Sequence, residues 1–320
     1  MTKLVHPKNS FAILSWLNVG VGIAMLFWQI IFGGLSSSFQ FGYFIIMLLL
    51  TGIPHGGLDH VIAKTTAGVH KHRFSLGIFL GRYVVVIALY ATTWFVFPSL
   101  SLLFFILISA WHFGETDIVC IEQKKIVTIS RFIWGCFVLL LILLTHQKET
   151  TEVLLRISKN SFVIMNAWQV CKNHATLILI TLTVINFILL LTAFILHQVQ
   201  FSFSRIANLL IILSIAIFLP LLPSFALYFG GWHAIRSFEL IFQYLNVSEN
   251  NIVKSPISMW KKSLPMSIIA GLSFVVASIF WNKNTMHWDP LPLVFIFLSV
   301  ITLPHLDVMD QMIRKEPIAL

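Results

Sequence analysis

Long apolar runs separated by short polar loops dominate this chain of 320 residues. A helix that crosses a bilayer needs about 20 mostly apolar residues. Stretches of roughly that kind cover residues 11–33, 40–63, 75–97, 100–120, 128–146, 176–198, 204–219, 223–245, 264–281 and 290–313. The seventh and eighth form one apolar run, which we divide at Pro220 and Pro223 because proline removes a backbone donor and disfavours helix before it.

The composition excludes a soluble protein of this size. The chain is 58% hydrophobic and only 10% charged, whereas a soluble domain carries about 25% charged residues. We therefore predict an all-α fold, a polytopic integral membrane bundle of about ten transmembrane helices. No linker or second domain is visible, so residues 1–320 are expected to form a single transmembrane domain.

The net charge of +9 does not indicate nucleic-acid binding, because the positive charges lie in loops between apolar stretches. Basic loops mark the cytoplasmic side, which predicts an inner-membrane, multi-pass protein with both termini in the cytoplasm. The basic loop 147–175 opposes this orientation, and part of it is expected to be an amphipathic helix on the outer surface. The basic residues that set the orientation are Lys64, Lys71, Arg73, Lys124, Lys125, Arg131, Arg205, Lys254, Lys261 and Lys262.

Ionisable residues within spans are few, and they are grouped in four motifs. The motifs are PHGGLDH at 54–60, WHFGETD at 111–117, GGWHAIRSFE at 230–239 and LPHLD at 303–307. Intramembrane ionisable groups are costly and mark functional sites by default. Each motif lies in an even-numbered span, so all four spans run in the same direction across the bilayer.

The four intramembrane histidines are expected to lie at similar depth. His55, His112, His233 and His305 stand about 15, 12, 10 and 15 residues into their spans, which at about 1.5 Å per residue places them in one layer roughly 8 Å thick. Four histidines at one level, each on its own helix, predict a metal site in the bundle core. Imidazole suits iron, copper or zinc.

The charged neighbours of these histidines are expected to orient the ligands, because a ligating histidine usually gives its other N–H to a carboxylate or carbonyl. The alternatives for the acidic residues are pairing with Arg82 or Arg236 between helices, or exposure at the cytoplasmic rim. Prolines 54 and 304 should each free a carbonyl one turn upstream, and the neighbouring glycines allow close helix packing. The residues expected around the ligands are Asp59, His60, Glu115, Asp117 and Arg236.

The four motifs in this order resemble the Brp/Blh family of bacterial and archaeal β-carotene 15,15′-dioxygenases. Members use iron and O₂ to cut β-carotene at its central double bond into two retinal molecules, often for a microbial rhodopsin. The resemblance implies Fe²⁺ as cofactor and His55, His112 and His233 as its ligands and catalytic residues. It also implies a carotenoid drawn from the bilayer, O₂ as co-substrate and a functional link to a microbial rhodopsin.

One position departs from the family pattern. The family's W-H-x-x-R-H is Trp232-His233-Ala234-Ile235-Arg236-Ser237 here. Serine is a poor iron ligand at neutral pH, so three histidines, His305 as a fourth ligand, or a water remain open. A different carotenoid substrate or a loss of catalysis remain open as well.

A proton- or ion-coupled transporter is the alternative from another class, because buried His, Asp and Glu on Gly- and Pro-interrupted helices would serve it too. The sequence shows no internal repeat between its halves, and the ionisable groups converge on one layer. Both features favour the oxygenase.

Overall fold

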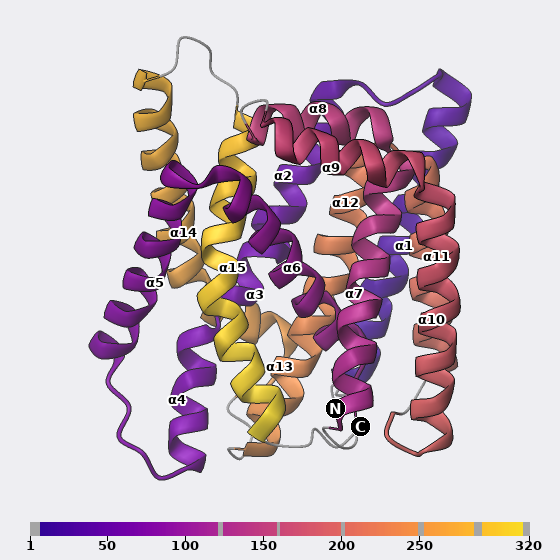
Figure 1. Cartoon of the computed structure of the whole chain (residues 1–320). Helices are drawn as coiled ribbons and strands as arrows, with labels where there is room; N and C mark the ends of the chain where they lie inside the picture. Colours follow the sequence, from indigo (N-terminus) through magenta and orange to yellow (C-terminus); the bar gives the residue numbers. More distant parts are fainter. Residues whose placement is uncertain are drawn as a thin grey trace.

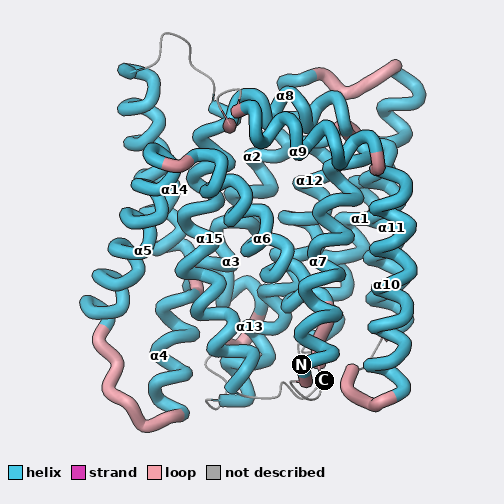
Figure 2. The backbone as a smooth tube through the Cα atoms, viewed as in Figure 1, coloured by secondary structure: helices cyan, strands magenta, loops and turns pink. Residues whose placement is uncertain are grey.

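The computed structural model is helical throughout its described part, residues 7–120, 124–158, 161–199, 202–248, 253–284 and 290–315. One isolated bridge between Cys120 and Val199 is the β-type pairing found there. Figure 2 shows the helices side by side, with the longer loops at the two ends of the bundle. The all-α prediction is confirmed.

The helices follow the predicted apolar stretches closely. The first half contains α1 (Pro7–Phe32), α2 (Ser37–Met47), the π-helix η1 (Leu48–Gly52), α3 (Ile53–Gly56), α4 (Asp59–Val69), α5 (Leu76–Val96), α6 (Pro98–Asp117) and α7 (Lys125–Thr145). The second half contains α8 (Gln147–Ile157), α9 (Phe162–Asn173), α10 (Ala175–Ile195), α11 (Phe203–Phe218), α12 (Leu221–Tyr228), the π-helix η2 (Phe229–His233), α13 (Ala234–Ser248), α14 (Pro256–Asn284) and α15 (Pro290–Lys315).

Among the described residues, eight helical segments are long and apolar enough to cross a membrane. Two of the ten predicted spans fall outside this set for visible reasons. The helix at Phe203–Phe218 is apolar but has only 16 residues, and the following segment is divided into α12, η2 and α13. The break between them lies at Leu219 and Pro220, where the sequence predicted it. The chain is therefore a polytopic helical bundle with eight candidate spans.

The predicted amphipathic segment in loop 147–175 is helical. Two short helices, α8 and α9, lie across one end of the bundle, and the first turns of α1 and the last turns of α15 lie at the other end (Figure 1). The Glu149 carboxylate accepts the backbone N–H of Leu221, and His146 lies 2.6 Å from the Ile142 carbonyl and 2.5 Å from that of Leu219. These contacts attach the start of α8 to the break before α12.

Glycines allow α6 and α7 to pack backbone against backbone. A Cβ on Gly114 would overlap the carbonyl of Arg131, and a Cβ on Gly135 would overlap the carbonyl of Ala110. The close approach predicted from the glycines is therefore present, and it fixes the helix that contains His112.

Replacing Gly135 with alanine should force α6 and α7 apart. Overpacking of this kind costs about 1–3 kcal/mol, and we expect a lower Tm for the purified protein in detergent. Gly271→Ala on α14 is the matched control, because nothing lies within 4 Å of a Cβ there. Equal Tm values for the two variants would contradict this packing.

Candidate metal centre

The helix that bears His55 is interrupted on both sides of this residue. The five residues Leu48–Gly52 form a π-helical turn, and a second break at Gly57 and Leu58 separates α3 from α4. Pro54 has no N–H, and the indole N–H of Trp260 donates to the Leu50 carbonyl one turn upstream at 2.8 Å. The expectation that Pro54 frees a carbonyl is confirmed, and α14 satisfies it.

A second π-helical turn, η2, ends at His233. It contacts η1, and a Cβ on its Gly231 would overlap the side chain of Asn18 on α1. Single π-helical turns inside α-helices are rare and frequently occur at functional sites. Here two of them lie side by side, and each sets the direction of one histidine.

The structure brings all four intramembrane histidines together. The ring centroid of His112 lies 4.6 Å from that of His233 and 4.8 Å from that of His305. The ring of His55 lies 4.8 Å from His305, 5.6 Å from His233 and 6.2 Å from His112. All four are at least 95% buried, so residues more than 240 positions apart share one interior site.

Three of the four histidines form a group that could hold one metal ion. His55, His112 and His305 each offer a nitrogen, and these atoms lie within 4.8 Å of one another. An imidazole–metal bond is about 2.1 Å for zinc, so two nitrogens on one ion lie at most about 4.2 Å apart. Small side-chain shifts would close the set, and His233 lies beside it, against His112.

Hydrogen bonds orient two of these rings. Asp59 accepts from His305 Nδ1 at 2.7 Å, and the same carboxylate accepts from the Tyr83 hydroxyl at 2.9 Å. His55 Nδ1 lies 3.2 Å from the Thr51 carbonyl, which can only accept. Both rings therefore carry the proton on Nδ1 and leave the Nε2 lone pair available.

The remaining ring nitrogens fit a metal. Both nitrogens of His112, both of His233 and Nε2 of His305 are buried without a hydrogen-bond partner among the described residues. Buried polar atoms normally have partners, and a cluster of unpartnered imidazole nitrogens provides the donor set of an iron, copper or zinc site. One nitrogen of each of these three rings is available to an ion, because an imidazole offers a single ion only one nitrogen.

Comparison with known proteins gives the same assignment as the motifs. The family model described as β-carotene 15,15′-dioxygenase matches residues 46–313, which include all four histidines. The chain belongs to this family. The β-carotene 15,15′-dioxygenase of uncultured marine bacterium 66A03 is 26% identical over 274 residues, 84% of this chain and 93% of that protein. No solved structure matches significantly.

Membership makes the chain a carotenoid dioxygenase family enzyme and favours the oxygenase over the transporter considered from sequence. Phenylalanine rings surround the histidines of this family enzyme. Measured between ring centroids, Phe113 lies 4.8 Å from His233, and Phe229 lies 5.8 Å from the same histidine. The centroid of His55 lies 6.1 Å from that of Phe229 and 6.5 Å from that of Phe238. The sequence could not single out these three among 29 phenylalanines.

Asp117, the last residue of α6, connects its own helix to three neighbouring helical segments. Its carboxylate accepts from the indole N–H groups of Trp134 (2.9 Å) and Trp232 (2.8 Å) and from the Tyr228 hydroxyl (2.8 Å). Pairing with Arg82 or Arg236 was the sequence alternative, and the hydrogen-bond partners are these aromatic side chains instead. Because Trp232 directly precedes His233, this network fixes η2.

The other residues expected near the ligands occupy different positions. Asp59 contacts a histidine of the cluster directly, and Glu115 is buried on α6 one turn after His112. His60 is only partly buried and makes no ring contact with the four histidines in the described part. The hydrogen bond of Arg236 is to Glu239, on its own helix, at 2.5 Å. Tyr83 was not expected, and its only sequence signal is a hydroxyl within an apolar span.

Ser237 stands one turn after His233, where the family pattern has a second histidine. It is fully buried, and its hydroxyl has no partner among the described residues. His305 reaches the cluster from α15. Of the alternatives left by the sequence, His305 therefore has the geometry of an additional ligand.

Asp117→Asn should destabilise the protein, because the amide N–H₂ would replace either the oxygen that accepts from Trp232 or the oxygen that accepts from Trp134 and Tyr228. Leaving buried donors unsatisfied costs about 1–3 kcal/mol each, and we expect a marked fall in Tm. Asp307→Asn is the control, because Asp307 is exposed on α15 and binds only Gln311 in the described structure. A Tm unchanged in both variants would contradict a stabilising role for the hydrogen bonds to Asp117.

Proposed function

We propose that this enzyme uses iron and O₂ to cleave β-carotene, or a related carotenoid, at its central double bond to give retinal. The observation that carries this proposal is the buried cluster of His55, His112, His233 and His305 within a chain of this family. The relative from the marine bacterium is named for the same reaction.

Four histidines would hold the iron, with His55, His112 and His305 nearest to a common point and His233 beside them. Bound iron would supply the one-electron chemistry with O₂ that amino-acid side chains lack. Asp59 keeps the proton of His305 on Nδ1 and directs Nε2 to the cluster. Tyr83 holds that carboxylate in place. Ser237 would not bind the iron; its small side chain leaves space where the family pattern has an imidazole.

The surrounding side chains would position an apolar polyene. A carotene offers no polar group for recognition, so the cleavage position must be set by shape and by contacts along the chain. Phe113, Phe229 and Phe238 supply apolar ring surfaces beside the histidines. Burial of the cluster excludes water from the reacting atoms. Entry from the bilayer suits a substrate that dissolves in lipid.

We further infer ten membrane crossings in an inner membrane, with both termini cytoplasmic, and one catalytic domain over residues 1–320. The short α11 and the broken segment α12–α13 would supply the two crossings beyond the eight candidates. The start of α1 and the end of α15 lie at the same end of the bundle (Figure 1), as an even number of crossings requires. The terminal residues 1–6 and 316–320 themselves lie outside the described residues. A link to a microbial rhodopsin as consumer of retinal belongs to the same proposal.

The proposed reaction can be tested in bacteria that accumulate β-carotene. Expression of this chain should replace β-carotene with retinal, measured by chromatography of extracted pigments, and His112→Ala should abolish the conversion. Retinal formation would also show that Ser237 permits catalysis. Unchanged β-carotene, with the protein confirmed in the membrane, would reject this substrate.

Metal content gives a test that does not depend on the substrate. Asp59→Asn removes the carboxylate that accepts from His305, and loss of such a partner typically costs 10–100-fold in metal affinity. We expect the purified variant to lose its iron at a chelator concentration about 10–100-fold lower than the wild type requires. Elemental analysis measures the iron that remains bound. Asp307→Asn should retain iron like the wild type. Equal retention in all three proteins would argue against the assigned role of Asp59.

A further inference from the structure

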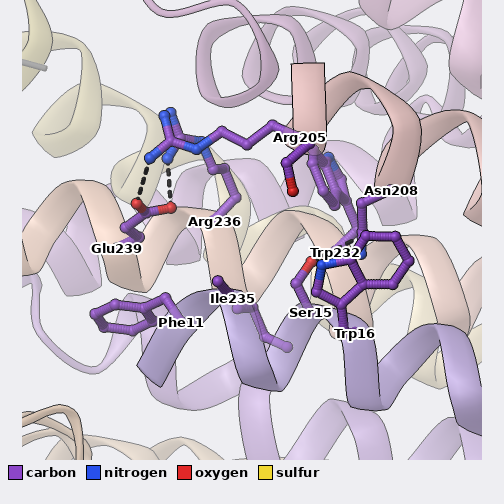
Figure 3. A pocket seen from close by; sticks show the side chains of 11 residues that line it. Phe11, Ser15, Trp16, Arg205, Asn208, Trp232, Ile235, Arg236 and Glu239 are labelled. Atoms are coloured by element: carbon purple, nitrogen blue, oxygen red, sulfur yellow. Dashed lines mark hydrogen bonds and ion pairs between the residues drawn. The ribbon is translucent and has the colours of Figure 1, made fainter. Parts of the chain in front are cut away.

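A second polar site lies apart from the histidine cluster. It is a small cavity of about 70 Å³ between the first turns of α1, α11 and α13, and none of the four clustered histidines lines it (Figure 3). Besides the indoles of two tryptophans, the polar groups on its wall are Ser15, Ser204, Arg205, Asn208, Arg236 and Glu239. A water needs about 10–15 Å³ by this measure, so the cavity has room for about five waters or one phosphate group.

The charged side chains that line this cavity carry a net positive charge. Arg205 donates to one oxygen of Glu239 at 2.6 Å, and Arg236 donates to the other at 2.5 Å. Two positive charges and one negative charge leave +1. The Arg236 side chain is only 6% exposed, and that of Arg205 is 35% exposed. One guanidinium is therefore held inside the protein, and the other lies at the rim.

The cavity offers more hydrogen-bond donors than acceptors. Both oxygens of Glu239 already accept from arginines, and the Asn208 carbonyl oxygen accepts from the Ser15 hydroxyl at 2.9 Å. The amide nitrogen of Asn208, a residue only 2% exposed, has no partner among the described residues. Each guanidinium has five N–H groups, and in the described part of the chain each arginine makes one hydrogen bond to Glu239, at 2.6 Å and 2.5 Å. A ligand that satisfies this wall must bring acceptor oxygens and negative charge.

The position of the cavity matches a lipid headgroup. The apolar span of α1 begins at Ser10. The α1 residues that line the cavity lie in the first two turns of this span, at the expected membrane boundary. A shallow apolar depression adjoins the cavity and shares Ala12 and Trp16 with it, and it extends over Ile13 and Leu17. Trp16 is 44% exposed, and tryptophan favours the membrane interface. Basic pockets between membrane helices bind anionic headgroups.

We propose that this cavity binds the phosphate of an anionic phospholipid, with an acyl chain lying on the apolar depression of α1. Asn208 and the free N–H groups of Arg205 and Arg236 would donate to the phosphate oxygens. Free inorganic phosphate has the same headgroup chemistry but cannot use the apolar depression. The proposal is independent of metal binding and of carotenoid cleavage.

The test is lipid retention by the purified full-length protein, measured by native mass spectrometry after addition of phosphatidylglycerol or phosphatidylcholine. The wild type should retain phosphatidylglycerol preferentially. Asn208→Asp is nearly isosteric and changes the net charge of the wall from +1 to zero, so retention should fall about 10-fold or more. Inorganic phosphate at the same concentration should not displace the lipid.

Arg82→Gln is the matched control, because Arg82 is an exposed arginine in the second turn of α5 and does not line the cavity. It should retain the lipid like the wild type. Equal retention by Asn208→Asp, or an equal loss in Arg82→Gln, would overturn the site, and displacement by inorganic phosphate would overturn the lipid assignment. If Asn208→Asp does not fold, Arg205→Gln at the rim must show the same loss, and its failure to do so would also overturn the site.

Discussion

Polar groups inside this bundle have no bulk water to bind, so each must find its partner in the protein or in a ligand. Buried carboxylates meet this demand by joining helices. Asp117 collects donors from α7, α12 and η2, Asp59 connects α4 with α5 and α15, and Glu239 connects α13 with α11. Several buried polar atoms have no protein partner in the described part, and five of them are nitrogens of the clustered histidines, gathered in one place. That contrast distinguishes the structural polar groups from the functional ones.

Departures from regular α-helix direct the histidines. Pro54 has no N–H to donate to the Leu50 carbonyl, which would stay unpaired in a continuous helix. Here Leu50 lies in the π-helical turn η1, and its carbonyl accepts from the indole N–H of Trp260. The matching turn η2 brings Gly230 and Gly231 close to neighbouring helices and ends at His233. Backbone irregularity at this depth is tolerated where it is buried in protein. The two irregular turns therefore mark the site as clearly as the histidines do.

Trp232 connects the two sites of the molecule. Its indole N–H binds Asp117, its ring lines the basic cavity, and the next residue is His233. Two adjacent residues, Trp232 and His233, thus belong one to the proposed headgroup site and the other to the histidine cluster. A phosphate bound beside Arg236 would stabilise the folded arrangement of α1, α11 and α13, since a ligand that binds only the native state raises its stability. The membrane would then contribute to the order of the catalytic core.

The sequence alone determined the class of the protein, the position of its helices and the four histidines, because apolar length and the cost of buried charge are local properties that can be read along the chain. It also identified Asp59 as a partner, since this residue stands within one motif with His55. Only the tertiary structure decided that Asp59 binds His305, that Tyr83 supports it, and that Arg205 binds Glu239 at a separate cavity. These pairings depend on which faces of distant helices meet. Packing between helices sets those faces, and the hydrophobic pattern of any single span leaves them open.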